Sequence, residues 1–154
     1  YRCEIMKIKK LICFVNIFLF FIFFSTVNLF AHEGATGIIK ERMDKFKESK
    51  QLMKTINAGL QQDNFKVIEE SAQMLLIWSK EMHNFFPEGS DVSPSEASSD
   101  IWLNPEEFKK AIKKFELASL ELINKSNTND RDNTINSFRN LAGTCKGCHE
   151  KFRN

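Results

Sequence analysis

Four stretches of this chain carry apolar residues at three- and four-residue steps, the spacing that places side chains on one face of an α-helix. The stretches span about residues 36–60, 64–84, 105–122 and 134–152, and no part of the sequence alternates convincingly as a half-buried β-strand does. Their apolar positions are Ile39, Met43, Phe46, Met53, Ile56 and Leu60, then Phe65, Ile68, Ala72, Leu75 and Met82, then Phe108, Ile112, Phe115, Ala118 and Leu122, then Ile135, Phe138, Leu141, Cys145, Cys148 and Phe152. Each stripe covers about three positions in seven, which predicts an all-α protein, an antiparallel four-helix bundle.

The second and third helices are separated by a long polar segment, FFPEGSDVSPSEASSDIW, residues 85–102. Two prolines, one glycine and five serines favour a loop, and this loop is longer than a bundle connection needs. Asn104 and Pro105 then form a start signal for the third helix. We find no internal repeat and expect one domain after the N-terminal segment.

The N-terminal segment has the layout of a secretory signal peptide. Met6 is followed by three lysines, an apolar run from residue 11 to 24, and small and polar residues that end at Ala31. We therefore expect residues 1–31 to be an extension plus signal peptide, with the start at Met6, and residues 32–154 to be the mature, periplasmic protein. Leu29 is larger than signal peptidase prefers two residues before the cut, so an uncleaved membrane anchor stays open as an alternative.

Removal of this segment changes the charge and the cysteine content of the chain. Of 22 basic and 20 acidic residues, 18 and 19 remain, a net charge of −1 that gives no electrostatic reason to expect a nucleic-acid partner. Of four cysteines, only Cys145 and Cys148 remain. An exported chain with two cysteines three residues apart is not a disulfide-framework protein.

The two cysteines and the next residue form Cys-x-x-Cys-His inside the last helical stretch. A zinc site needs four ligands, and the mature chain adds only His32 and His83 without a second pair at zinc-finger spacing. A redox-active disulfide of the thioredoxin type follows a strand, and a plain disulfide does not explain the histidine. The third alternative is one covalent haem c, with thioethers from Cys145 and Cys148 and iron ligation by His149. This alternative is the one we favour, because it uses all three residues.

A four-helix bundle with this motif on its last helix resembles the cytochrome c-prime family, the class II c-type cytochromes. Three patches carry the resemblance: IIKERMDKFKES in the first helix, FFPEGSD with SSDIW around the long loop, and CKGCHEKFR at the end. It implies that Arg42 pairs with a haem propionate, that Phe46 faces the distal side of the haem, and that Arg153 lies near the proximal histidine. It also brings in Trp102, as a haem neighbour or a core residue, and Asp91, as a turn cap or a propionate contact.

The residue at the distal position decides the expected chemistry. Family members with methionine there are six-coordinate and low-spin, whereas a leucine or phenylalanine leaves the iron five-coordinate and high-spin. Phe46 has no lone pair to donate, so this register implies a closed apolar pocket for small neutral ligands such as nitric oxide or carbon monoxide. Met43 lies one turn earlier, and a shifted register would make it an iron ligand instead.

These observations predict a haem protein that transfers electrons, binds a small gas, or does both, and that is not an enzyme. Met43 ligation would favour a low-spin electron carrier, and a haem-free helical module with a disulfide is the remaining alternative. The resemblance implies a possible homodimer through the first two helices. The sequence does not identify the redox partner.

Overall fold

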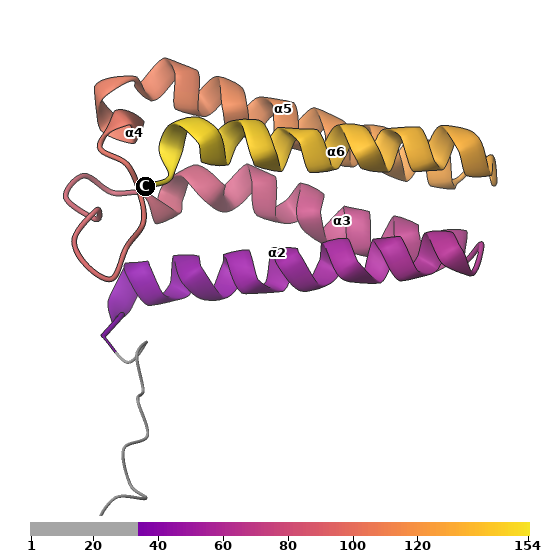
Figure 1. Ribbon diagram of the computed structural model, residues 1–154, viewed down its shortest axis with the longest axis horizontal. Helices are drawn as coiled ribbons and strands as arrows, with labels where there is room; N and C mark the ends of the chain where they lie inside the picture. Colours follow the sequence, from indigo (N-terminus) through magenta and orange to yellow (C-terminus); the bar gives the residue numbers. More distant parts are fainter. Residues whose placement is uncertain (1–33) are drawn as a thin grey trace, which may run out of the picture. The chain divides into compact units, whose positions relative to one another are not determined.

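A computed structural model of the protein describes residues 34–154. Its four long helices are α2 (Gly37–Gln61), α3 (Phe65–Glu81), α5 (Pro105–Ser126) and α6 (Arg131–Phe152). A 3-10 turn η1 (Met82–Phe85) extends α3, and a single helical turn α4 (Asp100–Leu103) precedes α5. The prediction of an all-α four-helix bundle is confirmed (Figure 1). The predicted extension and signal peptide, residues 1–31, lies outside the described residues.

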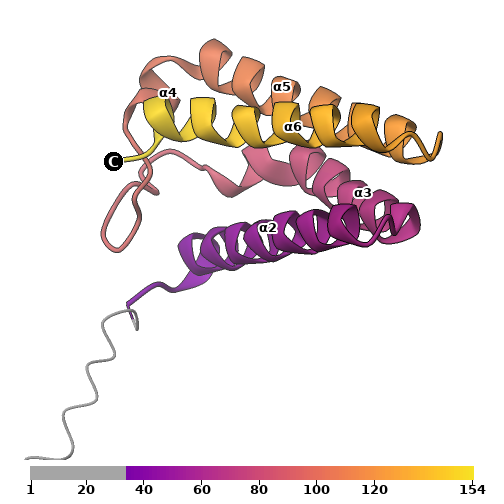
Figure 2. The ribbon, with the colours of Figure 1, turned by 45° about the vertical axis from the view of Figure 1, so that its right-hand side comes forward.

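Successive helices pack side by side, α2 on α3, α3 on α5 and α5 on α6, whereas the fourth neighbouring pair, α2 and α6, touches less (Figure 2). The buried face of each helix is the apolar stripe of its sequence, centred on residues such as Ile56, Leu75, Leu122 and Leu141, none of which is measurably exposed. Within residues 34–154 no helix combines the length and the apolarity that crossing a membrane requires.

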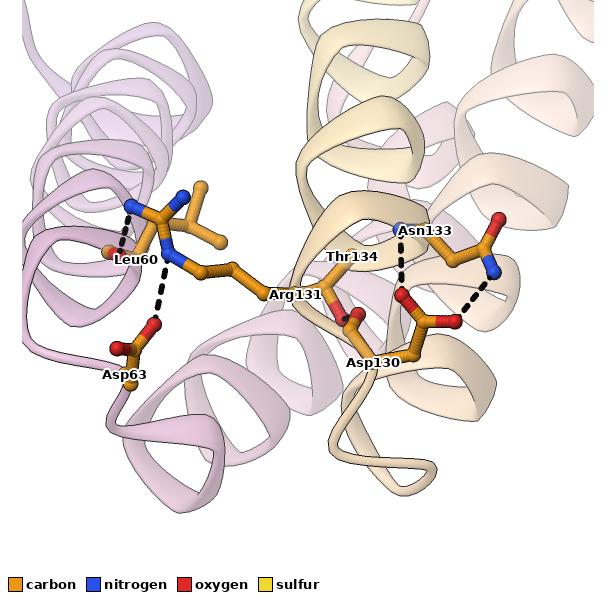
Figure 3. A network of polar contacts seen from close by, with 6 residues as sticks. All are labelled: Leu60, Asp63, Asp130, Arg131, Asn133 and Thr134. Atoms are coloured by element: carbon orange, nitrogen blue, oxygen red, sulfur yellow. Dashed lines mark hydrogen bonds and ion pairs between the residues drawn. The ribbon is translucent and has the colours of Figure 1, made fainter.

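Short turns close one end of the bundle, at residues 62–64 and 127–130, and each is followed by a capped helix. Asn64 accepts a hydrogen bond from the amide of Val67 (3.3 Å), and Asp130 accepts one from the amide of Asn133 (3.1 Å; Figure 3). These side chains occupy amide donors that the first helical turn leaves free. The caps explain why α3 and α6 begin where they do.

The long loop and the C-terminus lie together at the other end (Figures 1 and 2). The C-terminal residues pair with the loop: Ala97 and Arg153 form an isolated antiparallel bridge, the amide of Ser98 donates to the Phe152 carbonyl (3.0 Å), and the amide of Asn154 donates to the Glu96 carbonyl (2.9 Å). The last turn of α6 is therefore fixed to the loop that precedes α5.

Candidate functional site

The last helix places the three residues of the Cys-x-x-Cys-His motif. Cys145 and Cys148 are half-buried against the core and both thiols are free, while His149 is exposed. Leu141 and Phe152, both buried, anchor α6 on either side of the motif. Because residues three and four apart share a helix face, the two thiols and the imidazole lie on the same side of α6.

Burial tunes the protonation of these groups. It raises the pKa of the Cys145 thiol, and it raises the pKa of Cys148 to about 11, with a smaller contribution from the neighbouring Cys145. The side chain of His149 is exposed as a whole, but its ring packs against Phe46, and this loss of water, followed by the positive charge of Arg153, lowers the pKa of His149; the charge of Glu96 opposes the shift. At neutral pH the site therefore presents two protonated thiols and a neutral imidazole, whose lone pair suits a metal.

Phe46 of α2 faces the histidine. Its ring centroid lies 6.4 Å from that of His149 with an interplanar angle of 71°, and it also contacts Trp78 (5.6 Å) and Phe86 (6.3 Å) edge-on. Met43, one turn earlier, is half-buried and is not among the side chains packed against the core. Of the two candidates on α2, Phe46 is thus the one whose contact with His149 the structure records.

An aromatic cluster continues from Phe46 toward the loop end of the bundle. Phe86 contacts Phe108 (4.9 Å), which contacts Phe152 (5.2 Å), and Trp78 contacts Phe85 (5.1 Å). The indole Nε1 of Trp78 is buried and has no hydrogen-bond partner within the described part of the chain. Since buried donors are normally paired, this N–H is a candidate donor for a bound group.

Arg42 is buried, with 3% of its surface exposed, one turn before Phe46. Its guanidinium donates to the carbonyls of Phe85 (2.9 Å) and Ser90 (2.6 Å) and to the hydroxyls of Ser90 (2.8 Å) and Ser95 (2.7 Å). Its Cζ atom lies 4.4 Å from the ring centroid of Phe86. Burial lowers the pKa of Arg42, opposed by the charge of Asp91, but an arginine remains protonated.

The other predicted residues lie around the loop. Trp102 sits in α4 and donates from Nε1 to the carbonyl of Phe86 (3.1 Å), so it supports the aromatic cluster from outside. Arg153 follows α6 and donates from Nε to Glu96 Oε2 (2.6 Å). Asp91 is exposed in the loop and acts on Arg42 through its charge.

Sequence reasoning missed three residues of this site, Trp78, Phe86 and Glu96. Trp78 continues the apolar stripe of α3, three residues after Leu75 and four before Met82, and this signal was available. Phe86 and Glu96 lie in the loop, where no periodicity identifies which side chains turn inward.

A family model described as "Cytochrome C'" matches residues 37–153, which include α2, the loop and the whole of α6. The chain belongs to the cytochrome c' family. It is 41% identical over 69 residues to a cytochrome c' of Rhodospirillum rubrum, a match that covers 44% of this chain and 47% of that protein. A cytochrome c' of Pararhodospirillum photometricum matches over 55% of its length, so the chain spans about half of each of these relatives.

Solved structures of cytochrome c' share the fold. The crystal structure from Rubrivivax gelatinosus superposes with a TM-score of 0.68 at 27% identity and covers 76% of this chain and 94% of its own. A nitric oxide complex of a variant of the Alcaligenes xylosoxidans cytochrome c' superposes with a TM-score of 0.68 at 18% identity, covering 76% and 94%.

The residues of this cytochrome c' fit the haem c that its family binds. The two thiols and the imidazole share one face of α6, and the ring of Phe46 on α2 faces the imidazole. The buried Nε1–H of Trp78 has no hydrogen-bond acceptor within the described residues. In addition, no carboxylate among residues 34–154 is hydrogen-bonded to the buried Arg42, which leaves its charge without a bonded anion. A flat, largely apolar group that carries a negative charge matches these aromatic rings and this buried cation.

Proposed function

We propose that this cytochrome c' is an exported, periplasmic haem protein that binds one haem through Cys145 and Cys148 and ligates its iron with His149. The iron is five-coordinate and high-spin, and the protein binds a small gas, transfers electrons, or does both, without substrate turnover. The contact between Phe46 and His149 (6.4 Å) is the observation that carries this proposal, because it supports a hydrocarbon ring opposite the proximal ligand.

A bound haem supplies an iron centre that cycles between two oxidation states and takes up small diatomic ligands. The chain's own residues set the conditions. Phe46 has no lone pair and, together with Trp78 and Phe86, surrounds the distal side with hydrocarbon. Of these three rings only the indole of Trp78 carries a hydrogen-bond donor, so water and anions gain little in exchange for the solvation that they lose on entering this shell. A neutral diatomic gas has no charge and few hydrogen bonds to water, so it loses little solvation on entering this shell.

The charged residues around this shell would hold the haem's propionates and its proximal side. Arg42 supplies a buried positive charge for a propionate, with Asp91 and Trp102 in the surrounding loop and α4. Arg153 keeps a positive charge near His149, which favours its neutral imidazole. Charge-assisted hydrogen bonds to carboxylates are the stronger kind, so the propionate contact would contribute to haem orientation.

The relatives support a gas ligand and an assembly. The Alcaligenes xylosoxidans structure holds nitric oxide, and another cytochrome c' of the same fold is described as having ligand-controlled dimer dissociation, at 23% identity and a TM-score of 0.70. We extend both properties to this protein as proposals, a nitric oxide or carbon monoxide ligand and a homodimer.

Haem attachment and gas binding test this proposal together. The mature protein is co-expressed with haem-attachment machinery, denatured and weighed by mass spectrometry, and the folded protein is reduced and titrated with carbon monoxide. We expect one haem that survives denaturation, its loss in C145S/C148S, and a carbon monoxide complex. A colourless protein with a Cys145–Cys148 disulfide would refute haem binding, and a haem protein that binds no carbon monoxide would refute the gas-binding role.

A further inference from the structure

The side chain of Arg42 on α2 is hydrogen-bonded to the long loop between η1 and α5. The four hydrogen bonds of its guanidinium reach Phe85 at the end of η1, and Ser90 and Ser95 in the loop. Ser90 is buried, whereas Asp91 and Val92 between the contacts are exposed. One buried cation therefore holds three points of the segment from residue 85 to 95, most of whose other residues are exposed.

The same loop begins with the ring that covers Phe46. Phe86 stacks under the Arg42 guanidinium (4.4 Å) and also contacts Phe46 (6.3 Å). The position of Phe86 thus depends on both the loop backbone and the guanidinium. If the loop loosened, Phe86 would move away from Phe46, and the group of rings formed with Trp78 would open on that side. No residue that faces His149 would be removed.

We propose that Arg42 is a positioning residue that, through the hydroxyls of Ser90 and Ser95, anchors the loop and so limits the rate at which small ligands reach the distal side of the site. This inference rests on the proposed function for its ligand step, but the anchoring is a property of the polypeptide. It differs from a propionate contact, which uses the charge of Arg42 and does not need either serine.

The two roles are separable because different residues carry them. A change of Ser90 and Ser95 to alanine removes three hydrogen bonds, the two from Arg42 and the one that the amide of Ala97 donates to the Ser95 hydroxyl (3.0 Å), and leaves the charge of Arg42 in place. The control is S93A/S99A, since Ser93 and Ser99 are exposed serines of the same segment whose hydroxyls make no hydrogen bond within the described residues. Arg42→Lys keeps the charge and loses the forked geometry.

Two readouts are measured on the holoprotein. Hydrogen exchange is followed at the backbone amides of residues 86 and 90, which donate to the carbonyls of His83 and Pro87 and not to either changed hydroxyl. Carbon monoxide association is followed by flash photolysis of the reduced protein. Thermal unfolding by circular dichroism verifies that each variant is folded at the working temperature.

We expect S90A/S95A and R42K to speed exchange at these amides about tenfold, because loss of hydrogen bonds raises the population of the open loop. We expect carbon monoxide association to rise roughly threefold, the control to match the wild type, and the reduction potential of S90A/S95A to stay unchanged. Unchanged exchange, or unchanged association, in S90A/S95A would overturn the proposal.

The outcome is distinguishable from a failure of the proposed function. If the chain binds no haem, hydrogen exchange is measured on the haem-free protein and still reports on the loop anchor. Exchange in S90A/S95A that is no faster than in the wild type would then overturn the anchoring role by itself. If haem binds and only the reduction potential of R42K changes, Arg42 acts through its charge alone and the positioning role is wrong.

Discussion

The two ends of the bundle each use an arginine to join segments that are far apart in the sequence, and they use it differently. At the short-turn end Arg131 of α6 donates from Nε to Asp63 (2.8 Å) and from Nη2 to the Leu60 carbonyl (3.4 Å), with about half of its side chain exposed, 48% (Figure 3). At the loop end Arg42 is 3% exposed and makes four hydrogen bonds.

The two arginines differ because one end of the bundle has short, capped turns and the other has a long loop. The short turns at residues 62–64 and 127–130 are closed by their own caps and by helix packing, so the exposed ion pair adds little. The long loop forms no helix before α4 and pairs its backbone with the C-terminus only near Ala97, so the buried cation of Arg42 holds the part of the loop that comes before this pairing. The comparison indicates that the loop end depends on specific polar contacts and the turn end on close packing.

The largest expected effect is a loss of stability when the arginine of the loop end is replaced, compared with a small loss at the turn end. Arg42→Ala leaves the buried acceptors of Phe85 and Ser90 without a donor, which we expect to lower the free energy of unfolding by about 3 kcal/mol. Arg131→Ala removes an exposed pair and is expected to cost about 0.5 kcal/mol or less. Urea denaturation of both variants measures the difference, and equal losses would contradict the comparison.

The second effect concerns the close packing of the turn end, and two glycine-to-alanine changes test it. A Cβ atom on Gly59 would lie 2.9 Å from Ile68 Cγ1 and 3.3 Å from the Asn64 carbonyl oxygen, so Gly59→Ala is expected to cost about 1–2 kcal/mol. At Gly143 in α6 an added Cβ meets nothing within 4 Å. Gly143→Ala is therefore expected to stabilise by about 0.5–1 kcal/mol through helix propensity. A stabilising Gly59→Ala would show that this end is loosely packed.

A third, smaller effect concerns the cap of α6. The hydrogen bonds from the backbone and then the side chain of Asn133 hold the pKa of Asp130 below its usual value. The cap therefore stabilises the fold above the unfolded-state pKa of about 4 and loses its effect as the pH falls through the folded-state pKa. We expect Asp130→Ala to lower Tm by a few degrees at pH 7, and the gap to the wild type to narrow at pH 3. A constant gap would mean that the carboxylate charge is irrelevant.

The smallest effect concerns the ion pair at the C-terminus. Glu96 and Arg153 are more than half exposed, and the backbone bridge between Ala97 and Arg153 persists without the pair. We expect Glu96→Gln to change the free energy of unfolding by about 0.5 kcal/mol or less. A loss comparable to that of Arg42→Ala would show that the side-chain pair, and not the backbone pairing, fixes the end of α6.

Periodicity predicted the helices well because packing of one apolar face decides where a helix lies. The four helices and the motif on α6 were predictable from the sequence alone. The stripe spacing did not reveal α4, since a single turn is too short to show a period, nor the 3-10 turn that ends the second predicted helix near Phe85.

The candidate site was predictable to the extent that its residues lie on helices. Cys145, Cys148, His149 and Phe46 have fixed positions relative to the apolar stripes, so their faces follow from the spacing. The partners of Arg42 lie in the loop, and only the three-dimensional path of that loop brings Ser90 and Ser95 to it. Loop paths depend on individual contacts, which no period in the sequence records.

The most direct test of the central claim is the optical spectrum of the haem-loaded protein in both oxidation states, compared with Met43→Ala. The account predicts a broad high-spin Soret band in the reduced form that sharpens with nitric oxide or carbon monoxide, and the same spectrum in Met43→Ala. Sharp low-spin α and β bands that disappear in Met43→Ala would contradict it, because the sixth ligand would then be Met43 and not an open position beneath Phe46.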